Sequence, residues 1–301
     1  MQIEDIIDED TPNKHQAAKR STWISVAVNI VLTITQLIAG VFSHSQGLIA
    51  DAIHSLSDLI ADFVVLFANH HSQKGADDDH HYGHQRYENA ASLVLGGLLL
   101  VVGLGMLWSA FGKIQNPESI QPVKVIALWV ALGALLSKEL LFRYMLAVAE
   151  RVRSSMLIAN AWHARSDAAS SLVVALGIGG NLLGYHLLDP IAAMIVGLMV
   201  AKMGWGFAWD AMHDLMDRAV NEDKVEQIRT TLIDTPELIG IHALKTRKMG
   251  DLILVDVHLE VDRTMTVEQG HDIAVLARQR VLTAHADVLN VMTHVDPADA
   301  R

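Results

Sequence analysis

The chain has 301 residues, of which 51% are hydrophobic and only 19% charged, so it is more apolar than an ordinary soluble domain. Its formal net charge of −11 lies mainly outside the apolar stretches, which argues against nucleic acid as a partner. Cysteine is absent, which excludes a disulfide framework and any thiolate metal site. The composition therefore predicts a membrane protein in which any metal site uses imidazole and carboxylate ligands and binds borderline or hard divalent ions.

Six apolar stretches are each long enough to cross roughly 30 Å of hydrocarbon. The sequence before the first lacks a basic start and a small-residue cleavage site, so we expect no removable signal peptide. We predict membrane-spanning helices at 22–42, 47–69, 89–111, 123–144, 156–183 and 190–209. This organisation gives an N-terminal tail at 1–20, a six-helix transmembrane domain at 21–210 and a soluble domain at 211–301.

Lysine and arginine are unevenly divided between the connections on opposite sides of the predicted membrane. One side carries Lys14, Lys19, Arg20, Lys74, Arg86, Arg143, Arg151 and Arg153, whereas the other carries only Lys113 and Lys124. Because positive residues are retained on the cytoplasmic side, both termini and the soluble domain are expected in the cytoplasm.

The soluble domain is predicted to contain a helix, two strands, a second helix and a third strand. Hydrophobic residues alternate with polar ones over 252–262, which is typical of a half-buried strand, and Gly250-Asp251 suits a hairpin turn from a strand at 242–248. Thr266 and Gln269 form a capping-box pattern that opens a helix. This helix is expected to bury Val267, Ala274, Ala277 and Val281, and the last strand to cover 289–296. The predicted fold class is thus a six-helix integral membrane protein with a C-terminal cytoplasmic α+β domain of αββαβ order.

Polar residues interrupt the second apolar stretch along one helical face. Asp51, His54, Asp58 and Asp62 follow one another at i, i+3, i+7 and i+11. One such residue is as often part of a hydrogen-bonded seam between helices as a functional group, but four are much harder to explain in that way. Ionisable groups at this depth usually mark an ion path.

A matching pair, His163 and Asp167, lies four residues apart on one face of the fifth stretch. Together with His54 and Asp58 it would surround one ion with two imidazoles and two carboxylates. Zinc prefers tetrahedral coordination by nitrogen and oxygen ligands of this kind. The residues alone therefore predict a buried divalent-metal site between the second and fifth spans.

Several segments resemble the cation diffusion facilitator family, and the resemblance covers nearly the whole chain. They are LIADAIHSLSD at 48–58, DDDHHYGHQRYE at 77–88, HARSD at 163–167, LMDR at 215–218, KTR at 245–247, HLE at 258–260 and HVDP at 294–297. The combination is most similar to the bacterial zinc and ferrous-iron efflux branch, whose members are homodimeric proton antiporters with a metallochaperone-like cytoplasmic domain.

The resemblance implies that the transport site consists of His54, Asp58, His163 and Asp167. His54 stands where the best-known bacterial relatives have aspartate, and it resembles the vesicular zinc transporters of higher cells. A second imidazole suits zinc and should disfavour Mn²⁺ and Ca²⁺. Cadmium tolerance is correspondingly in question. Asp51 is not a ligand in the family, and it is expected either to support the site indirectly or to face water near the extracellular mouth.

Two further metal sites are implied outside the spans. The resemblance assigns a loop site to Asp77, His80 and His84, although Asp78, Asp79 and His81 crowd the same stretch and a loosely solvated loop is the alternative. It also implies a charge pair between Arg86 and Asp217. Strand alternation puts His258 on a polar face, and His294 and Asp296 on a shared face. The resemblance to the family adds His242 and His271 to these residues, and implies that together they form a zinc site at a dimer interface.

The ligand chemistry predicts an exporter of Zn²⁺ from the cytoplasm in exchange for protons, and the resemblance implies a multi-pass homodimer in the bacterial inner membrane. The leading alternative is a transporter of the same class for Fe²⁺, Co²⁺, Cd²⁺ or Mn²⁺. A non-transporting membrane metal sensor or scaffold is the other. An enzyme is not expected, because no nucleophile beside a base and no phosphate-binding glycine loop is evident.

Overall fold

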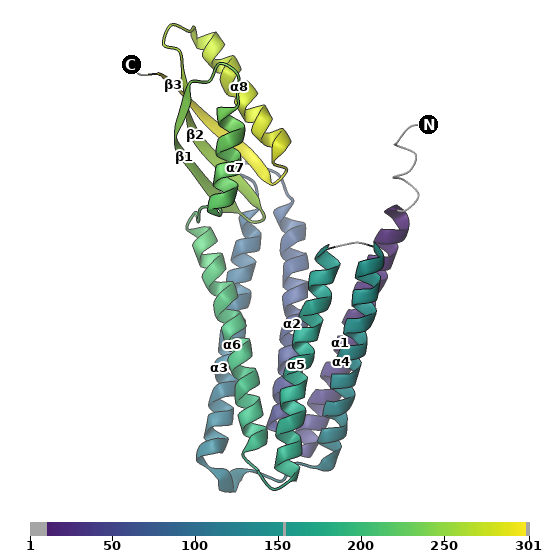
Figure 1. Ribbon diagram of the computed structural model, residues 1–301. Coiled ribbons are helices and arrows are strands. Elements are labelled where there is room, and N and C mark those ends of the chain that lie inside the picture. Colours follow the sequence, from purple (N-terminus) through teal and green to yellow (C-terminus); the bar gives the residue numbers. More distant parts are fainter. Residues whose placement is uncertain (1–10, 153–154, 299–301) are drawn as a thin grey trace. The chain divides into compact units, whose positions relative to one another are not determined.

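The structure is a computed structural model that describes residues 11–152 and 155–298. The described chain forms long helices followed by a small α/β region (Figure 1). The long helices are α1 (Thr11–Ser43), α2 (Gln46–Ser72), α3 (Arg86–Gln115), α4 (Val125–Val152), α5 (Ser155–Leu182) and α6 (Leu188–Leu215), with a short 3-10 helix at Pro117–Ser119. The α/β region contains α7 (Glu222–Ile233), β1 (Gly240–Met249), β2 (Leu252–Val261), α8 (Val267–Ala284) and β3 (Val288–Pro297).

The chain divides into two compact units. The first combines Met1–Phe63 with Gly97–Trp205, and the second combines Val64–Gly96 with Gly206–Arg301. The first unit therefore contains most of the long helices, and the second contains the remaining ends of α2, α3 and α6 together with the α/β region.

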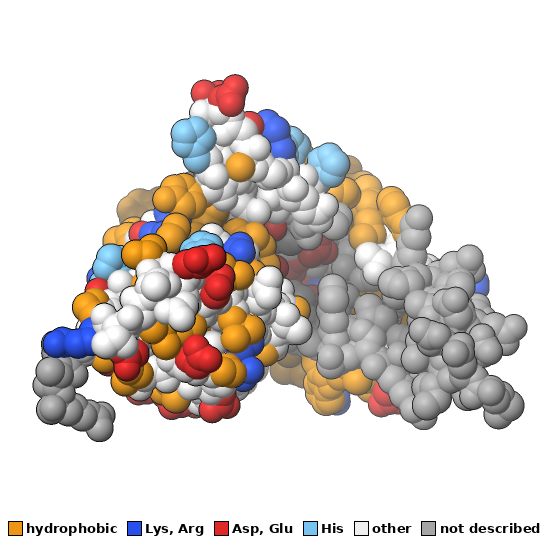
Figure 2. All heavy atoms as spheres, turned by 90° about the horizontal axis from the view of Figure 1, so that it is seen from above, with side chains coloured by type: hydrophobic (Ala, Val, Ile, Leu, Met, Phe, Trp, Pro, Cys, Tyr) orange, Lys and Arg blue, Asp and Glu red, His pale blue; other side chains and the backbone are white. Residues whose placement is uncertain are grey.

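Four of the long helices, among the described residues, are apolar enough to cross a membrane: Arg20–Ser43 in α1, Arg86–Gln115, Val125–Arg151 in α4 and Leu188–Leu215. Large hydrophobic side chains of these helices are exposed, as Trp108 is with 80% of its surface. Figure 2 shows hydrophobic side chains beside charged and histidine side chains on the face that it views. Exposed hydrophobic side chains on long helices suit contact with lipid. The chain thus has a helical transmembrane region. The two remaining long helices, α2 and α5, have 27 and 28 residues and contain the predicted transport ligands.

Within the first unit, helix packing depends on small residues and on an apolar cluster. Leu141, Phe142 and Met145 of α4 pack against Ala161 of α5. A side chain at Gly103 of α3 would lie 2.5 Å from the backbone nitrogen of Ala201 in α6, so only glycine permits this close approach.

Asp189 joins the beginning of α6 to the beginning of α2. Its buried carboxylate accepts hydrogen bonds from the Ser45 hydroxyl at 2.6 Å and from the backbone N–H groups of Gln46 at 2.7 Å and Gly47 at 3.2 Å. These N–H groups have no partner inside α2, and a negative charge is favourable at a helix N-terminus. Asp189 therefore fixes the end of α2 from which the polar stripe begins.

The α/β region is a three-stranded sheet of order β1-β2-β3, with helices α7 and α8 covering one face (Figure 1). β1 and β2 are antiparallel, and β2 and β3 are parallel. The apolar residues of β2, among them Val255, Val257 and Leu259, are buried against Ile228 and Leu232 of α7 and against residues of α8. The other face of the sheet bears the polar side chains.

The predicted αββαβ order and the alternation in β2 agree with the structure, and the Thr266–Gln269 capping box is confirmed at the start of α8. The inward placement of Val267 is wrong, because 92% of its surface is exposed, whereas Ala274, Ala277 and Val281 are buried. Val267 is the first residue of α8. The hydrophobic pattern of the helix does not reveal how far the sheet beneath it extends, so the exposure of this end could not be predicted. Helix α1 begins at Thr11, so it extends into the stretch predicted as a tail, whose residues 1–10 lie outside the described chain.

Candidate metal sites

Three of the four predicted transport ligands of α2 and α5 lie together in the first unit. Ligand atoms of His54, Asp58 and Asp167 all lie within 4.8 Å of one another. His54 Nδ1 is 3.6 Å from Asp58 Oδ2, and His54 Nε2 is 4.0 Å from Asp167 Oδ1. One imidazole and two carboxylates therefore converge on a point where a divalent cation would have its charge balanced.

His163 precedes Asp167 by one turn of α5, but its side chain lies outside those that the structure describes. Asp62, the last residue of the predicted stripe, is exposed and is not among the groups that converge with His54.

Asp51 lies one turn from His54 and is fully buried, so of the two alternatives predicted for it, exposure to water is excluded and indirect support of the site stays a prediction. Its carboxylate accepts hydrogen bonds from Ser170 Oγ at 2.9 Å, from Ser171 Oγ at 2.7 Å and from Gln36 Nε2, and it pairs with Lys138 Nζ at 3.4 Å. None of these partners of Asp51 was predicted from the sequence. Lys138 had a visible signal, since it is a lysine inside an apolar span.

The loop between α2 and α3 brings Asp77, His80 and His84 together, with ligand atoms within 4.8 Å of one another. Asp77 is 3.2 Å from His80 Nδ1 and 3.4 Å from His84 Nε2. His84 Nδ1 donates to the Gly75 carbonyl at 3.0 Å, so in the neutral ring the lone pair is on Nε2, which faces Asp77. Asp78, Asp79 and His81 are outside this group.

Lys74 supplies the positive charge beside the loop group. Its Nζ lies 2.6 Å from Asp77 Oδ2, and this bond, with the hydrogen bonds from His80, holds the pKa of Asp77 well below its usual range. Asp77 is therefore a carboxylate at neutral pH. The Arg86 guanidinium beyond this loop pairs with Asp217 and donates to the Leu215 carbonyl at 3.1 Å, within the second unit.

The polar face of the sheet carries the third group. His242, His258 and His294 are register partners on β1, β2 and β3, so they form a row across the three strands. Asp296 Oδ2 lies 2.8 Å from His258 and 3.1 Å from His242, and Asp296 Oδ1 lies 3.2 Å from His294. The hydrogen bond from His258 and the other histidines lower the pKa of Asp296.

Two residues qualify the prediction for this face. Glu260, which the sequence analysis did not consider as a ligand, lies 3.9 Å from His242 Nε2. His271 is exposed on α8, and among the described residues it is not one of those that converge with Asp296.

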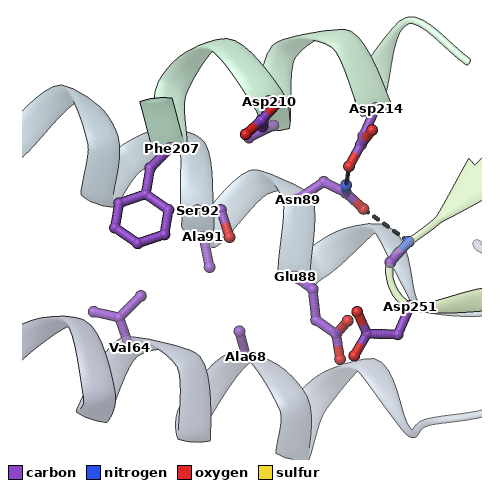
Figure 3. A pocket seen from close by; sticks show the side chains of 12 residues that line it. Val64, Ala68, Glu88, Asn89, Ala91, Ser92, Phe207, Asp210, Asp214 and Asp251 are labelled. Carbon is purple, nitrogen blue, oxygen red and sulfur yellow. Dashed lines mark hydrogen bonds between the residues drawn. The ribbon is translucent and has the colours of Figure 1, made fainter. Parts of the chain in front are cut away.

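A separate cavity of about 230 Å³ in the second unit is lined by apolar residues together with four carboxylates (Figure 3). Figure 3 shows Glu88 and Asp251 facing each other, with Asp210 and Asp214 on α6. Asn89 crosses its edge, donating to Asp214 at 3.4 Å and accepting from the Gly250 N–H at 3.0 Å. The β1–β2 turn is thereby hydrogen-bonded to α3.

Comparison with known proteins gives matches along most of the chain. Residues 22–216 match the cation efflux transmembrane domain, and residues 220–298 match the cation efflux protein cytoplasmic domain. Metal tolerance protein 2 of Oryza sativa subsp. japonica is 32% identical over 93% of this chain and 78% of its own length. The manganese efflux system protein MneS of Bacillus subtilis is 32% identical over 92% of this chain and 95% of its own length. A solved MamM CTD structure covers 26% of this chain with 23% identity and a TM-score of 0.25, and all of its own chain is matched.

Proposed function

Because the chain belongs to the cation diffusion facilitator family of divalent-metal efflux transporters, we propose that it exports Zn²⁺ from the cytoplasm in exchange for protons. The chain is a membrane transporter and not an enzyme. The proposed elements are Zn²⁺ as the transported ion, protons as the counter-ion, and the residues that bind them.

The convergence of His54, Asp58 and Asp167 carries the proposal. Two carboxylates balance the charge of one divalent cation, and His54 contributes an imidazole nitrogen. His163 would complete a tetrahedral set of two nitrogen and two oxygen ligands, since it lies one turn from Asp167 on α5. Zinc accepts this set readily, whereas Mn²⁺ and Ca²⁺ prefer more oxygen ligands.

Proton exchange follows from the chemistry of the ligands. An imidazole binds a metal only through an unprotonated nitrogen, so zinc and protons compete for the same histidine atoms. A site that opens to each side in turn would load zinc where zinc is bound more readily than protons. It would release zinc on the side where protons displace it.

The wider arrangement is part of the proposal. We infer six membrane spans, with α2 and α5 added to the four apolar helices, and both termini in the cytoplasm of a bacterium whose inner membrane holds the protein. The proposed domain limits are 1–20, 21–210 and 211–301, with helix α1 beginning inside the first of these segments. The bacterial zinc and ferrous-iron branch remains the proposed affiliation.

The two groups outside the spans are proposed as further zinc sites. Asp77, His80 and His84 would hold one ion in the α2–α3 loop. His242, His258, His294 and Asp296 would bind zinc on the sheet, where His271 from a second copy of the chain would complete a homodimer interface. The row of histidines around Asp296 supports this assignment, since adjacent strands present the ligands on one face.

Flux in proteoliposomes tests the proposal. Vesicles containing the wild-type chain should take up zinc while protons leave, whereas the same vesicles with His54→Ala and Asp58→Ala together should do neither. A matched double variant, His70→Ala with Asp78→Ala, removes the same residue types outside the site and should transport normally. Zinc flux that persists in the His54→Ala, Asp58→Ala variant would refute the assignment.

Two alternatives stay open to measurement. MneS is a manganese efflux system protein, which favours Mn²⁺ as the rival cargo, and Fe²⁺, Co²⁺ and Cd²⁺ are the other candidates. Competition between these ions in the same flux assay distinguishes them. A metal sensor or scaffold would bind zinc on the sheet without any metal flux.

A further inference from the structure

A buried polar cluster lies directly beside the transport ligands, on the side toward the beginning of α2. We call the Asp51 cluster the group Gln36, Asp51, Lys138, Ser170 and Ser171. Its members come from α1, α2, α4 and α5, so four helices meet at one carboxylate. Lys138 Nζ also donates to Ser55 Oγ at 3.1 Å, which fixes it a second time to α2.

The Asp51 cluster and the transport site are in contact through the helix backbone. Asp51 lies three residues before His54 on α2, and Ser170 lies three residues after Asp167 on α5. Ser170 Oγ lies 2.9 Å from an Asp51 carboxylate oxygen and 2.7 Å from the Asp167 carbonyl oxygen, so its single hydroxyl hydrogen has an acceptor in the cluster and another at the transport-site residue. An ion held by the transport ligands would therefore have the Asp51 cluster as its neighbour in the direction of Gln46.

Solvent exposure falls steadily along this direction. The side chains of Asp167 and Asp58 are 19% and 17% exposed, that of His54 is 7% exposed, and those of Lys138 and Asp51 are 3% and 1% exposed. The side chains are thus more enclosed at Asp51 than at Asp58 and Asp167.

The charges of the Asp51 cluster also matter for the site. Lys138 offsets the charge of Asp51, so that Asp58 and Asp167 provide a formal charge of −2 for a divalent cation. Removing one partner of a buried ion pair leaves an uncompensated charge that must recruit water or another ion. A neutral pair of similar size has no such requirement.

We propose that the Asp51 cluster is the seal that closes the ion path on the Gln46 side of the transport site, with Lys138 as the positioning residue that holds it shut. The inference deepens the proposed transport function and rests on it. Opening toward the Gln46 side requires α4 to withdraw Lys138 from α2, and α5 to withdraw its two serines. The seal opens only when water replaces these hydrogen bonds.

The absence of cysteine from the sequence permits a direct test. Asp58→Cys introduces a single thiol at the site, in the full-length protein and without metal. A membrane-impermeant cationic thiosulfonate is added from the face opposite the soluble domain, in vesicles whose orientation is checked by protease cleavage of that domain. With Lys138 present, labelling should be slow from this face. With Lys138→Met it should be faster by about tenfold or more, since the uncompensated Asp51 carboxylate admits water.

Matched variants distinguish a seal held by charge balance from a general packing defect. Lys138→Arg keeps the charge and should label as slowly as the parent, and so should the neutral pair Asp51→Asn with Lys138→Met. Labelling from the soluble-domain face should stay the same in all these variants. If Lys138→Met fails to fold, Asp51→Asn alone, which leaves the lysine unbalanced, should give the same acceleration.

Equal labelling rates with and without the charge imbalance would overturn the proposal, as would rapid labelling of the parent from the Gln46 side. Acceleration in the neutral pair equal to that in Lys138→Met would also overturn it. The labelling does not require transport. Zinc flux measured in the chain with Asp58 intact therefore reports separately on the proposed function, and a chain that seals but carries no zinc would contradict only the latter.

Discussion

At the scale of single residues, the α2–α5 site is defined by few atoms, so one substitution changes its chemistry. His54 is the only histidine among the ligands whose side chains are described there, and it lies close to both carboxylates. The balance of nitrogen and oxygen ligands, rather than the fold, then sets the preference among divalent ions.

The substitution His54→Asp, which replaces a nitrogen ligand by an oxygen ligand, should broaden the metal selectivity toward cadmium. A third carboxylate can bind through one or both oxygens and so tolerates a larger ion than a compact set with two imidazoles. We expect the zinc-to-cadmium flux ratio in proteoliposomes to fall. The control, His70→Asp, makes the same change at an exposed position of α2 and should leave the ratio as it is. An unchanged ratio in His54→Asp would show that His54 does not determine selectivity.

His285, at the end of α8, predicts a pH dependence of stability. It is 9% exposed, and its ring lies 3.0 Å from Thr231 Oγ1 and 3.4 Å from Lys224 Nζ. Burial, followed by the charge of Lys224, lowers its pKa. The folded state therefore favours neutral His285. The stabilisation is fully present above the unfolded pKa of about 6.5 and is lost as the pH falls through the lower folded pKa.

The corresponding measurement is thermal unfolding in a chelator, followed by circular dichroism from pH 7.5 to pH 5.5. The wild type should lose more thermal stability over this interval than His285→Gln, whose side chain takes up no proton. Asp287, whose pKa is lowered mainly by its hydrogen bond from Lys224, titrates below this interval and does not interfere. Equal losses in the two proteins would exclude the role given to His285.

At the scale of elements, the β1–β2 turn requires glycine at position 250 for two reasons, its left-handed backbone conformation and its close contact with neighbouring atoms. Gly250 has a φ of 64°, and an added Cβ would lie 2.7 Å from Glu88 Oε2 and 3.1 Å from the Gln85 carbonyl. Its N–H donates to Asn89, so the turn can move away from α3 only by losing that hydrogen bond.

Gly250→Ala should therefore destabilise the protein by about 1–2 kcal/mol, the usual cost of a left-handed conformation for a residue with a Cβ. The matched control is Gly75→Ala in the α2–α3 loop, where an added Cβ meets no atom within 4 Å. Thermal unfolding of the two variants in parallel tests this comparison. A Gly250→Ala protein as stable as Gly75→Ala would mean that the turn relaxes away from α3 without loss.

Elements with local sequence signals were the ones that could be predicted. Alternation identified β2, the Thr266–Gln269 pair identified the start of α8, and long, mainly apolar stretches identified the long helices. The predicted burial of Val267 was wrong, because burial on α8 depends on how far the strands beneath this helix extend. The local pattern of hydrophobic residues therefore predicts whether a segment is a helix or a strand, but not how much of it packs against other elements.

At the scale of the whole molecule, the convergence of His54, Asp58 and Asp167 could be predicted because α2 and α5 each carry a histidine and an aspartate at a spacing of four. The environment of Asp51 could not, since Lys138 and Ser170 lie 87 and 119 residues away along the chain. Only the packing of α2 with α4 and α5 reveals that this carboxylate is neutralised. The row of histidines around Asp296 could be predicted in part. Strand alternation predicted which face the side chains share, whereas the sheet register, seen only in the structure, shows which of them are in contact.

X-ray absorption of bound zinc tests the central claim most directly. Alanine is substituted for Asp77, His80 and His84 in the loop, and for His242, His258, His294 and Asp296 on the sheet, so that the α2–α5 site alone remains. We predict one zinc ion per chain, bound by imidazole nitrogen and carboxylate oxygen at about 2.0–2.2 Å, and lost on Asp58→Ala. A chain that retains no zinc, or that holds zinc without imidazole, would contradict a transport site built by His54, Asp58, His163 and Asp167.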